Sequence, residues 1–485
     1  MIDLLEQIDV TKKMTKDVYD EKMESLIIKM GELQRKCKEC GIPVILLFDG
    51  IDAAGKGFMI NKTIQFLDPR GFKVYTTGKE SEDEKMRPYM WRFFTKTPEK
   101  GRIHIFDQSW YKGAFDGKIS EKAVNDFEKM LTDDGVLIIK LFLLISKKTQ
   151  KKRLDNLLAS EDTKWRVTKS DLKNNKDYDQ VVSRYDEIIV HTDKSYSPWT
   201  IVEATDKNYA SCKIASVLVE RMEEAVKRAE NGSKPVQSEG ESVDDSFRNG
   251  ILNGIDLSKT LTREEYRKKR KELQKRLGVL HNKMYLQRVP VVLAFEGWDA
   301  GGKGGAIKRL TQAMDPRGYE VVPIASPNDI ERAHHYLWRF WEKFPKAGHM
   351  AIFDRTWYGR VLVERIEGFA TEEEWKRAYN EINNMEEQLV ESGCIVLKFW
   401  MHVDKDEQER RFRDRENTPE KQWKITDEDW RNRAKWDEYE KAVDEMVLRT
   451  STTGAPWIIV EANSKYYARI KVLETVIEAL EKRLK

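Results

Sequence analysis

Two glycine-rich segments, each with a lysine near its end, are the parts of this sequence best suited to hold phosphate. They are GIDAAGKG at residues 50–57 and GWDAGGKG at residues 297–304, and each follows an apolar run that predicts a buried strand. A strand, a glycine loop and a helix in that order form a P-loop, whose backbone N–H groups hold an oligophosphate while the lysine reaches the phosphate being moved. The alternative is a glycine-rich turn without a ligand. We interpret both segments as phosphate-binding loops.

The loop residues that should contact phosphate can be named from the P-loop pattern, but the residue after the lysine departs from that pattern. In the second loop the expected contacts come from Gly297, Gly301, Gly302, Lys303 and Gly304. A standard P-loop places Ser or Thr after the lysine to bind Mg²⁺, but Gly57 and Gly304 stand there. Any metal would then need carboxylate ligands, and the candidates inside the loops are Asp52 and Asp299.

A further candidate metal ligand, Asp354, ends the apolar segment 348–354. In P-loop enzymes an acid at the end of such a strand holds or orients Mg²⁺, whereas in many other strands it only caps a turn. Because a P-loop precedes this strand in the chain, we expect Asp299 and Asp354 to bind Mg²⁺.

Arginines follow this acid directly. Arg355 and Arg360 could clamp a transferring phosphoryl group and offset the charge that develops on it. The alternative is a surface ion pair with Glu364 or Glu367. We expect Arg355 and Arg360 to clamp the phosphoryl group. For Arg365 we leave both the phosphoryl clamp and the surface ion pair open.

The segment 406–433 is dense in arginine and tryptophan and follows a predicted strand. P-loop kinases often carry a mobile cationic lid at this place, which closes over phosphates and excludes water. A solvated helix with i,i+4 ion pairs is the alternative. Because Arg411, Arg413 and Arg415 cannot all serve one stripe of ion pairs, we favour the lid and expect these three to bind phosphate or nucleotide.

Alternating strands and helices must position these groups. In the second half, strands are expected at 291–295, 320–324, 350–353, 394–400 and 457–460, with helical stretches between them. This alternation predicts an α/β fold in which helices cover both faces of a parallel sheet. Ligands of such sheets lie beyond the carboxyl ends of the strands, where the glycine loops fall. We therefore expect two tandem P-loop kinase-like domains with three αβα layers and a helical lid each.

The two halves of the chain are copies of one another. An offset of 247 aligns Lys56 with Lys303, and an offset of 258 later aligns Trp199 with Trp457. The second copy thus holds 258 − 247 = 11 additional residues. A repeat of this length is a whole domain and not a solenoid unit.

The first copy retains the glycine loop but lacks most of the arginines. Asp107 is followed by Gln108, and Gly113 stands opposite Arg360. At the 258 offset, Asp155 and Leu157 stand opposite Arg413 and Arg415. We therefore expect Asp52, Lys56 and Asp107 to form a degenerate site.

Length and composition agree with two domains in one chain. A chain of 485 residues exceeds one ordinary core, and we expect a degenerate or structural N-terminal domain at 1–228, a linker at 229–258 and a catalytic domain at 259–485. The formal charge of +3 argues against a dedicated nucleic-acid binder. Four cysteines give no disulfide framework. With no evident signal peptide or membrane span, we expect a cytoplasmic protein that contacts no membrane and could form a homo-oligomer.

Three motifs make the chain similar to the two-domain class of the polyphosphate kinase 2 family. They are FEGWDAGGKG at 295–304, YLWRFW at 336–341 and FDRTWYGRVLVER at 353–365. The resemblance covers nearly the whole chain outside the linker. It implies an enzyme that makes ADP from AMP with inorganic polyphosphate as donor and Mg²⁺ as cofactor, with the second domain active.

The resemblance also implies roles for single residues. Lys303 would contact the phosphates, while Asp299 and Asp354 would hold Mg²⁺ or orient the acceptor phosphate. Arg355, Arg360 and the lid arginines would grip polyphosphate and nucleotide. Two other functions share parts of this pattern: an ATP-dependent nucleoside monophosphate kinase, and a polyphosphate-binding scaffold without turnover.

Overall fold

The computed structural model describes residues 4–232 and 250–484 and divides the chain into two compact units. Within the described residues, the first unit comprises 4–80, 89–232 and 328–338, and the second comprises 81–88, 250–327 and 339–484. Residues 233–249 of the expected linker lie outside the described residues, so the linker stays a prediction.

A parallel sheet of five strands forms the centre of the first unit, in the order β2-β3-β1-β4-β5. The strands are β1 (Val44–Gly50), β2 (Phe72–Thr76), β3 (Ile103–Asp107), β4 (Leu137–Leu144) and β5 (Trp199–Glu203). Every residue of β1 is buried. A continuous apolar strand of this kind fits only a sheet that is covered on both faces, as the alternation of strands and helices predicted.

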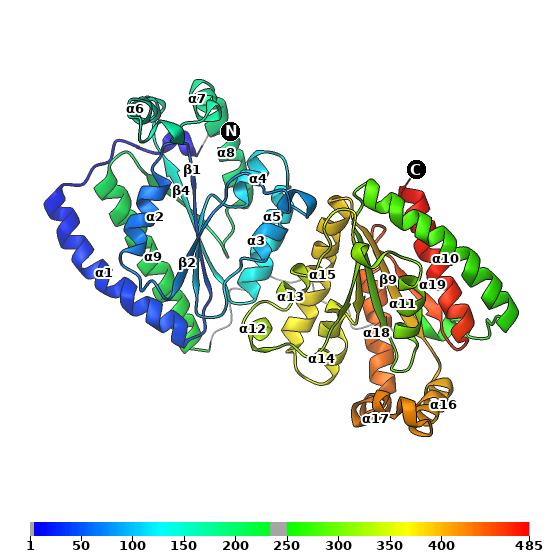
Figure 1. Ribbon diagram of the computed structural model, residues 1–485. Coiled ribbons are helices and arrows are strands. Elements are labelled where there is room, and N and C mark those ends of the chain that lie inside the picture. The colour runs from blue at the N-terminus through cyan, green and yellow to red at the C-terminus, as the bar shows by residue number, and fades with distance from the viewer. Residues whose placement is uncertain (1–3, 233–249, 485) are drawn as a thin grey trace. The chain divides into compact units, whose positions relative to one another are not determined.

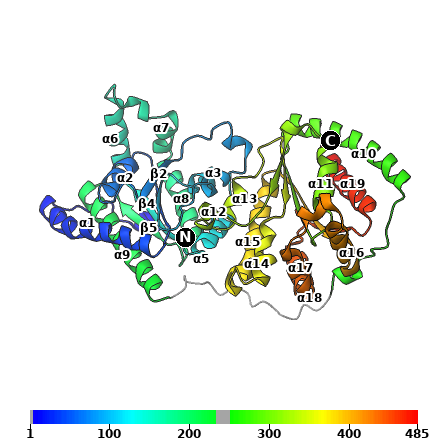
Figure 2. The ribbon, with the colours of Figure 1, turned by 60° about the horizontal axis from the view of Figure 1, so that its bottom comes forward.

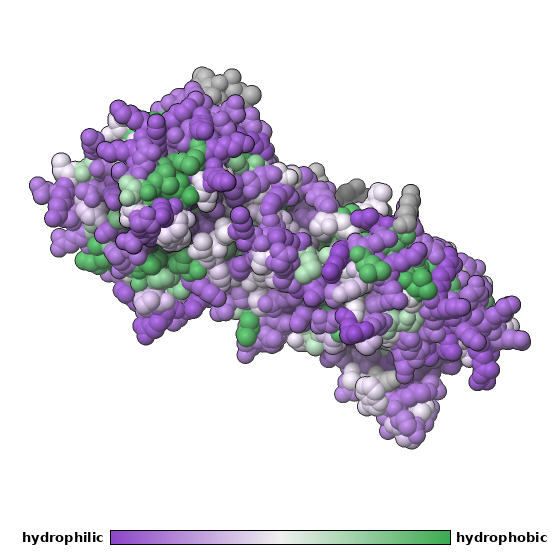
Figure 3. All heavy atoms as spheres, turned by 45° about the horizontal axis from the view of Figure 1, so that its top comes forward, coloured by the Kyte–Doolittle hydropathy of each residue, from purple (hydrophilic) through white to green (hydrophobic). Residues whose placement is uncertain are grey.

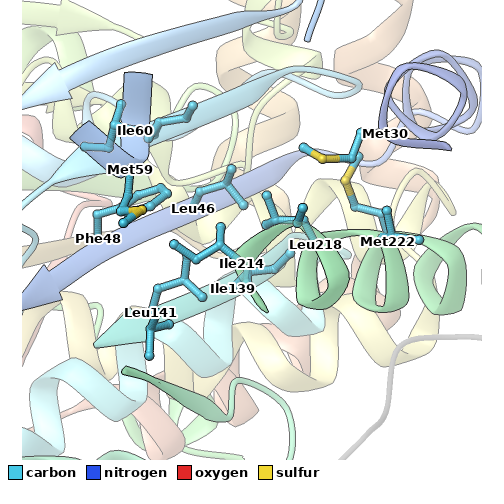
Figure 4. Close-up of a cluster of buried hydrophobic side chains, with 14 of the residues drawn as sticks. Met30, Leu46, Phe48, Met59, Ile60, Ile139, Leu141, Ile214, Leu218 and Met222 are labelled. Carbon is cyan, nitrogen blue, oxygen red and sulfur yellow. The ribbon is translucent and has the colours of Figure 1, made fainter. Parts of the chain in front are cut away.

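Helices cover both faces of this sheet (Figure 1). One face carries α1 (Lys16–Glu39), α2 (Lys56–Ile64) and α9 (Lys207–Glu230), and the other carries α3 (Trp91–Phe94), α4 (Tyr111–Phe115), α5 (Glu121–Asp133) and α8 (Tyr178–Thr192). The helices α6 (Lys147–Leu158) and α7 (Lys169–Lys176) lie together at one end of the unit (Figures 1 and 2). In the core under α9, Leu46 and Ile139 of the strands pack against Ile214 and Leu218 (Figure 4).

The second unit repeats this architecture. Its parallel sheet has the order β10-β9-β6-β8-β7, which is the order of the first sheet read from the other edge. The strands are β6 (Val291–Gly297), β7 (Tyr319–Pro323), β8 (Met350–Asp354), β9 (Ile395–His402) and β10 (Trp457–Glu461). Each expected strand of this half is present within about two residues of its predicted bounds, the usual uncertainty of element ends.

Helices flank this second sheet in the same way. One face carries α10 (Arg263–Leu286), α11 (Lys303–Thr311) and α19 (Lys465–Arg483), and the other carries α13 (Trp338–Trp341), α14 (Val363–Ile366), α15 (Glu372–Glu391) and α18 (Trp436–Thr450). The expected lid consists of α16 (Lys405–Glu416), η7 (Pro419–Lys424) and α17 (Asp427–Ala434). The remaining short helices are α12 (Asp329–Arg332), η1 (Leu5–Gln7), η2 (Glu84–Met86), η3 (Lys164–Arg166), η4 (Leu252–Gly254), η5 (Pro316–Gly318) and η6 (Trp357–Val361).

The eleven additional residues of the second copy fall in two places. The N-cap residues Ser120 of α5 and Thr371 of α15 differ by 371 − 120 = 251 positions, which is four more than the earlier offset of 247. Helix α15 has 20 residues and α5 has 13, which adds seven. The additions therefore lengthen the loop around α14 and the helix that follows it, and both come directly after the arginines at 355 and 360.

The surface in Figure 3 is mostly hydrophilic, and its hydrophobic residues gather in separate patches. Among the described residues, no helix has both the length and the apolar character needed to cross a membrane.

Candidate active site

The second glycine loop is built so that only small residues fit its turns. Gly297 has a φ of 146° and Gly302 a φ of 110°, both in the region that side chains disfavour. A Cβ atom on Gly297 would lie 2.6 Å from the carbonyl oxygen of Met401 in the neighbouring strand β9. The loop is therefore pressed against the end of β9, and α11 begins at Lys303 with its N–H groups directed toward the loop.

Lys303 lies across the mouth of this loop. Its Nζ donates a hydrogen bond to the carbonyl oxygen of Gly297 at 2.7 Å. In the first unit the Nζ of Lys56 donates to Gly50 at 3.1 Å in the same way. An ammonium group held at the loop mouth can exchange this carbonyl for a phosphate oxygen, so the geometry supports the predicted role of Lys303.

Two side chains from other parts of the chain, Arg355 and Asn432, contact the carboxylate of Asp299. The guanidinium of Arg355 lies 3.5 Å from one carboxylate oxygen of Asp299. The amide of Asn432, on α17 of the lid, donates to the other oxygen at 3.0 Å. The structure thus brings together the glycine loop, the segment after β8 and the lid, which are far apart in the sequence.

Arg355 adopts a strained backbone conformation with a φ of 67°. Its side chain is 51% exposed, so the guanidinium is open to solvent next to the loop. Asp354 precedes it at the end of β8, and the register of the sheet places Asp354 beside Phe295 of β6. Asp354 and the glycine loop consequently share one edge of the sheet, as predicted.

Glu296 is a site residue that sequence reasoning missed. It lies at the end of β6, is 7% exposed, and accepts hydrogen bonds from the backbone N–H and the hydroxyl of Thr356 at 2.7 and 2.8 Å. Burial raises the pKa of this carboxyl, although Lys303 and Arg355 partly offset that effect. An acid at the end of an otherwise apolar strand, directly before the loop, was the signal that could have revealed it.

Arg360 and Arg365 are held by acids of their own domain. The Nε of Arg360 lies 3.2 Å from Glu364, and this arginine is only 16% exposed. The structure therefore contains the ion pair that was the alternative to a phosphate clamp. Arg365 hydrogen-bonds Glu445 at 2.7 Å and stacks on Trp375 at 3.9 Å. These contacts favour the structural interpretation for Arg365.

A buried ion pair supports the segment that carries these arginines. Lys398 of β9 and Glu386 of α15 are almost fully buried and lie 2.6 Å apart. Glu386 accepts hydrogen bonds from the side chains of Trp357 and Tyr358, which follow Arg355 closely. The first unit has the same arrangement around Lys140 and Glu128. Because both units share it, we assign this network to fixing the segment after the strand and not to the reaction.

The lid arginines differ from the sequence interpretation. Arg411 is buried, and its guanidinium donates to four backbone carbonyls, those of Ala300, Gly301, Ala462 and Asn463. It therefore braces the glycine loop from behind. Arg413 forms an i,i+4 pair with Glu409 at 2.5 Å. Arg411 and Arg413, which we expected to bind phosphate, thus form ion pairs within α16. Arg415 lines a cavity behind the loop.

A small cavity of about 90 Å³ opens in front of the loop. The glycine loop contributes Gly297, Asp299 and Lys303, and the facing wall contains Arg355. Further lining residues come from the region of the additional residues, from the lid and from α18: Leu362, Val363, Glu428, Asn432 and Tyr439. A phosphate on the loop would therefore share this cavity with Arg355 beside the lid.

The first unit has no space for an arginine at the position that corresponds to Arg360. Gly113, opposite Arg360, has no room for a side chain because a Cβ atom would lie 2.2 Å from the ring of Tyr89. Phe115 stacks on Tyr185 at 4.5 Å. The lid of the first unit consists of α6, η3 and α7, and the amide of Asn174 on α7 donates a hydrogen bond to Asp52 at 2.8 Å. Burial raises the pKa of Asp107, and Lys56 partly offsets that effect. The first unit keeps the loop and its lid contact but has a phenol where the second has an arginine.

The carboxylates of the second site fit a magnesium ion that is shared with a substrate. Mg²⁺ is usually held by one or two carboxylates together with substrate phosphates, and Asp299 and Asp354 supply two at one sheet edge. Among residues 4–232 and 250–484, no group of three or more His, Cys, Asp or Glu side chains is arranged to hold a metal ion. These carboxylates would therefore need phosphate oxygens to complete the coordination.

Comparison with known proteins gives matches over the whole length of the chain. The family described as polyphosphate kinase 2 matches residues 13–230 and again residues 260–485. The polyphosphate:AMP phosphotransferase of Pseudomonas aeruginosa is 42% identical, over 99% of both chains. The enzyme of the same name from Acinetobacter johnsonii is 36% identical, over 90% of both. A crystal structure of a candidate polyphosphate kinase 2 from P. aeruginosa superimposes with a TM-score of 0.86 at 40% identity and 99% coverage of both chains.

Proposed function

The chain belongs to the polyphosphate kinase 2 family, and we propose that it transfers a phosphoryl group from inorganic polyphosphate to AMP. Full-length relatives named polyphosphate:AMP phosphotransferases support the reaction. One observation supports the second unit as the place of the reaction. Lys303, Asp299 and Arg355 line a single cavity at its glycine loop. The first unit, with Gln108 and Gly113 in place of two arginines, is proposed to have no turnover.

The transfer requires little covalent chemistry from the protein. An oxygen of the AMP phosphate attacks the terminal phosphorus of polyphosphate, and the bond from that phosphorus to the chain oxygen breaks. The products are ADP and a polyphosphate shortened by one phosphate. Lys303 and the N–H groups of the loop would hold the terminal phosphate, and Arg355 would offset the charge on the transferring group. Catalysis then rests on positioning and charge stabilisation.

We propose Mg²⁺ as the cofactor, held by Asp299 and Asp354 together with phosphate oxygens. When bound, the ion would neutralise part of the charge on the phosphates. The Asn432 amide fixes the carboxylate of Asp299 beneath the lid, so closure of the lid would also orient this ligand. The four cysteines are free, which supports our proposal of a reducing, cytoplasmic location.

One assay tests the proposal directly. The purified protein is incubated with AMP and Mg²⁺, and with either inorganic polyphosphate or ATP as the donor. We expect ADP to form with polyphosphate and to require the metal. Formation of ADP only with ATP would instead establish a nucleoside monophosphate kinase. Tight binding of polyphosphate without ADP formation would establish a scaffold.

A further inference from the structure

A cavity in the first unit lies at the end of the sheet opposite to the glycine loop. It measures about 260 Å³, against about 90 Å³ for the cavity in front of the second glycine loop. Ile42 and Pro43, directly before β1, and Val136, directly before β4, line it together with the last turns of α9. The cavity is therefore bounded by the amino ends of strands, whereas the candidate active site lies at carboxyl ends.

The corresponding place in the second copy is occupied by a side chain. A Cβ atom on Gly135, which lines the cavity, would meet no atom within 4 Å. On Gly393, its counterpart at the 258 offset, a Cβ atom would lie 3.5 Å from the guanidinium of Arg483. Arg483 stands opposite Ala225, which also lines the cavity. An arginine thus takes up in the second unit the space that an alanine leaves open in the first.

The lining of the cavity has an excess of positive charge. Its three cationic side chains are Lys100, from the loop before β3, and Arg221 and Arg228 of α9, and its one acid is Asp134. Arg221 also lies 3.5 Å from Glu224. Because a guanidinium has five N–H donors, this contact leaves donors of Arg221 for a ligand. Three cations against one acid give the lining two positive charges in excess.

Apolar and aromatic groups form another part of the lining. Ile42 and Val136 are buried apolar side chains at the cavity, and Tyr196 lies beside them in the segment before β5. The hydroxyl of Tyr196 donates a hydrogen bond to the carbonyl oxygen of Asn125 at 3.3 Å, which holds the ring in place. A ligand could therefore meet cationic groups and apolar groups in the same cavity.

We propose that this cavity of the first unit binds a phosphate monoester with an apolar or aromatic organic part, such as a nucleoside monophosphate. A phosphate monoester carries a charge of about −1.5 to −2 at pH 7, which matches the excess charge of the lining, and arginines bind phosphate oxygens in pairs of hydrogen bonds. The organic part would lie against Ile42, Val136 and Tyr196. The inference goes beyond the proposed function, because it gives a binding role to the unit that is proposed to have no turnover.

Cys40 provides a reporter of whether the cavity is occupied. It lines the cavity and is exposed, whereas Cys37, Cys212 and Cys394 are buried. Burial raises the pKa of Cys37 to about 12, so this thiol stays protonated and unreactive. A ligand in the cavity should therefore slow the alkylation of Cys40 by iodoacetamide, which mass spectrometry of the Cys40 peptide measures in the full chain.

The experiment uses AMP as the ligand, and adenosine and inorganic phosphate as its two parts. When AMP exceeds its Kd tenfold, about one cavity in ten is empty, so alkylation of Cys40 should slow by up to about tenfold. Adenosine and inorganic phosphate should each protect Cys40 much less, because each lacks one of the two kinds of contact. Equal protection by either of them would overturn the proposed class of ligand.

A pair of double variants tests the cationic lining. Lys100→Ala with Arg221→Ala gives the cavity the alanines found at 347 and 479 in the second copy. It should raise the AMP concentration for half protection by about tenfold or more, since each charge-assisted hydrogen bond contributes up to about that factor. Lys147→Ala with Arg166→Ala is the control and should leave protection unchanged, because these exposed residues of α6 and η3 follow the carboxyl end of β4.

Ala225→Arg tests the space itself, because it introduces the residue found at Arg483 in the second copy. AMP should not protect Cys40 in this variant. Each alkylation rate is compared with that of the same variant without ligand, and thermal unfolding verifies that the variants are folded. Absence of protection in the wild-type chain, or protection that persists in both cavity variants, would overturn the proposal. A chain that protects Cys40 but forms no ADP from AMP and polyphosphate would refute only the proposed function.

Discussion

Arg355 is the residue at which the chemistry of the two copies differs most directly. Its counterpart Gln108 has nearly the same backbone conformation, with a φ of 62° against 67°. The strained turn therefore forms with either glutamine or arginine. The two sites differ at this position in the guanidinium group and not in the backbone. At this position a substitution can exchange the chemistry while the local fold is kept.

Arg355→Gln should therefore lower kcat by about 10² to 10³, the loss expected when one charge-stabilising donor is removed from a transition state. ADP formation from AMP and polyphosphate measures the effect. The matched variant Gln108→Arg should add no activity, because the ring of Tyr89 occupies the space opposite Arg360 in the first unit. An Arg355→Gln enzyme with unchanged kcat would show that the guanidinium does not act on the transferring group.

His402 offers a test of pH dependence beside the same loop. It is 5% exposed, and its Nδ1 accepts a hydrogen bond from the indole of Trp298 at 3.1 Å. Burial lowers its pKa from 6.5 to about 4. The folded state therefore excludes a proton that the unfolded state binds, so stability is complete above pH 6.5 and falls as the pH drops toward 4.

From these values the second domain should lose about 2 kcal/mol of stability between neutral pH and about pH 5. His402→Leu, which introduces the residue found at Leu144 in the first copy, should remove this dependence. Its stability at neutral pH should be lower, because the indole of Trp298 loses its acceptor. Calorimetric unfolding across this pH range compares the two proteins, and equally steep profiles would contradict the assignment.

The predicted roles of Asp299, Lys303 and Asp354 stay predictions, whereas Arg411 and Arg413 make contacts that their spacing did not predict. Asp299 and Lys303 line one cavity with Arg355 because the glycine loop and the end of β8 lie at the same end of the sheet. Arg411 was assigned to phosphate, but it braces the loop through backbone carbonyls. Such contacts depend on how α16 packs against the loop, so they cannot be predicted from the spacing of arginines along the chain. Glu296 was missed for a similar reason, since its burial follows from the sheet.

The lid is the element that connects the loop to the rest of the site. In both copies an asparagine of the lid binds the loop aspartate, Asn432 to Asp299 and Asn174 to Asp52. A glutamine of the preceding helix also donates to the loop backbone in each copy. The lid is thus attached to the very residue that is proposed to hold the metal, and its position should affect substrate binding.

Asn432→Ala should therefore raise the KM for AMP and polyphosphate by about three- to tenfold, since a hydrogen bond to a charged group contributes on the order of 1.5 kcal/mol. Unfolding temperature should change little, because Asn432 lies on the short helix α17. Hydrogen exchange of α17 should become faster. Asn174→Ala in the first copy is the control and should leave the KM values unchanged; a parallel rise there would contradict the separate roles of the two lids.

Strands and helices were easier to predict than the additions that distinguish the two copies. Apolar runs fixed all five strands of the second sheet, because a strand buried on both faces has little freedom in composition. The eleven additional residues were counted correctly from the two offsets. The sequence did not show that four of these residues lie in the loop around α14 and seven in α15. Both segments have compositions that a helix accepts, so the start of α15 could not be located.

At the scale of the whole molecule, the two duplicated units have the same fold but different side chains at their glycine-loop sites. Both units share the sheet order, the glycine loop, the buried lysine–glutamate pair and the lid contact. Of the arginines that follow the strand at the site, Arg355 and Arg360 occur only in the second unit, since Gln108 and Gly113 stand opposite them. The features common to both copies therefore belong to the fold, and those confined to the second are the ones we assign to the reaction.

The comparison of Lys303→Ala with Lys56→Ala tests this division most directly. Both variants remove the same side chain from the same place in a glycine loop, so the fold experiences nearly equal changes. ADP formation from AMP and polyphosphate should fall by about 10² to 10³ or more in Lys303→Ala and should remain close to the wild-type rate in Lys56→Ala. Equal losses in the two variants would contradict the account of one working site in the second domain.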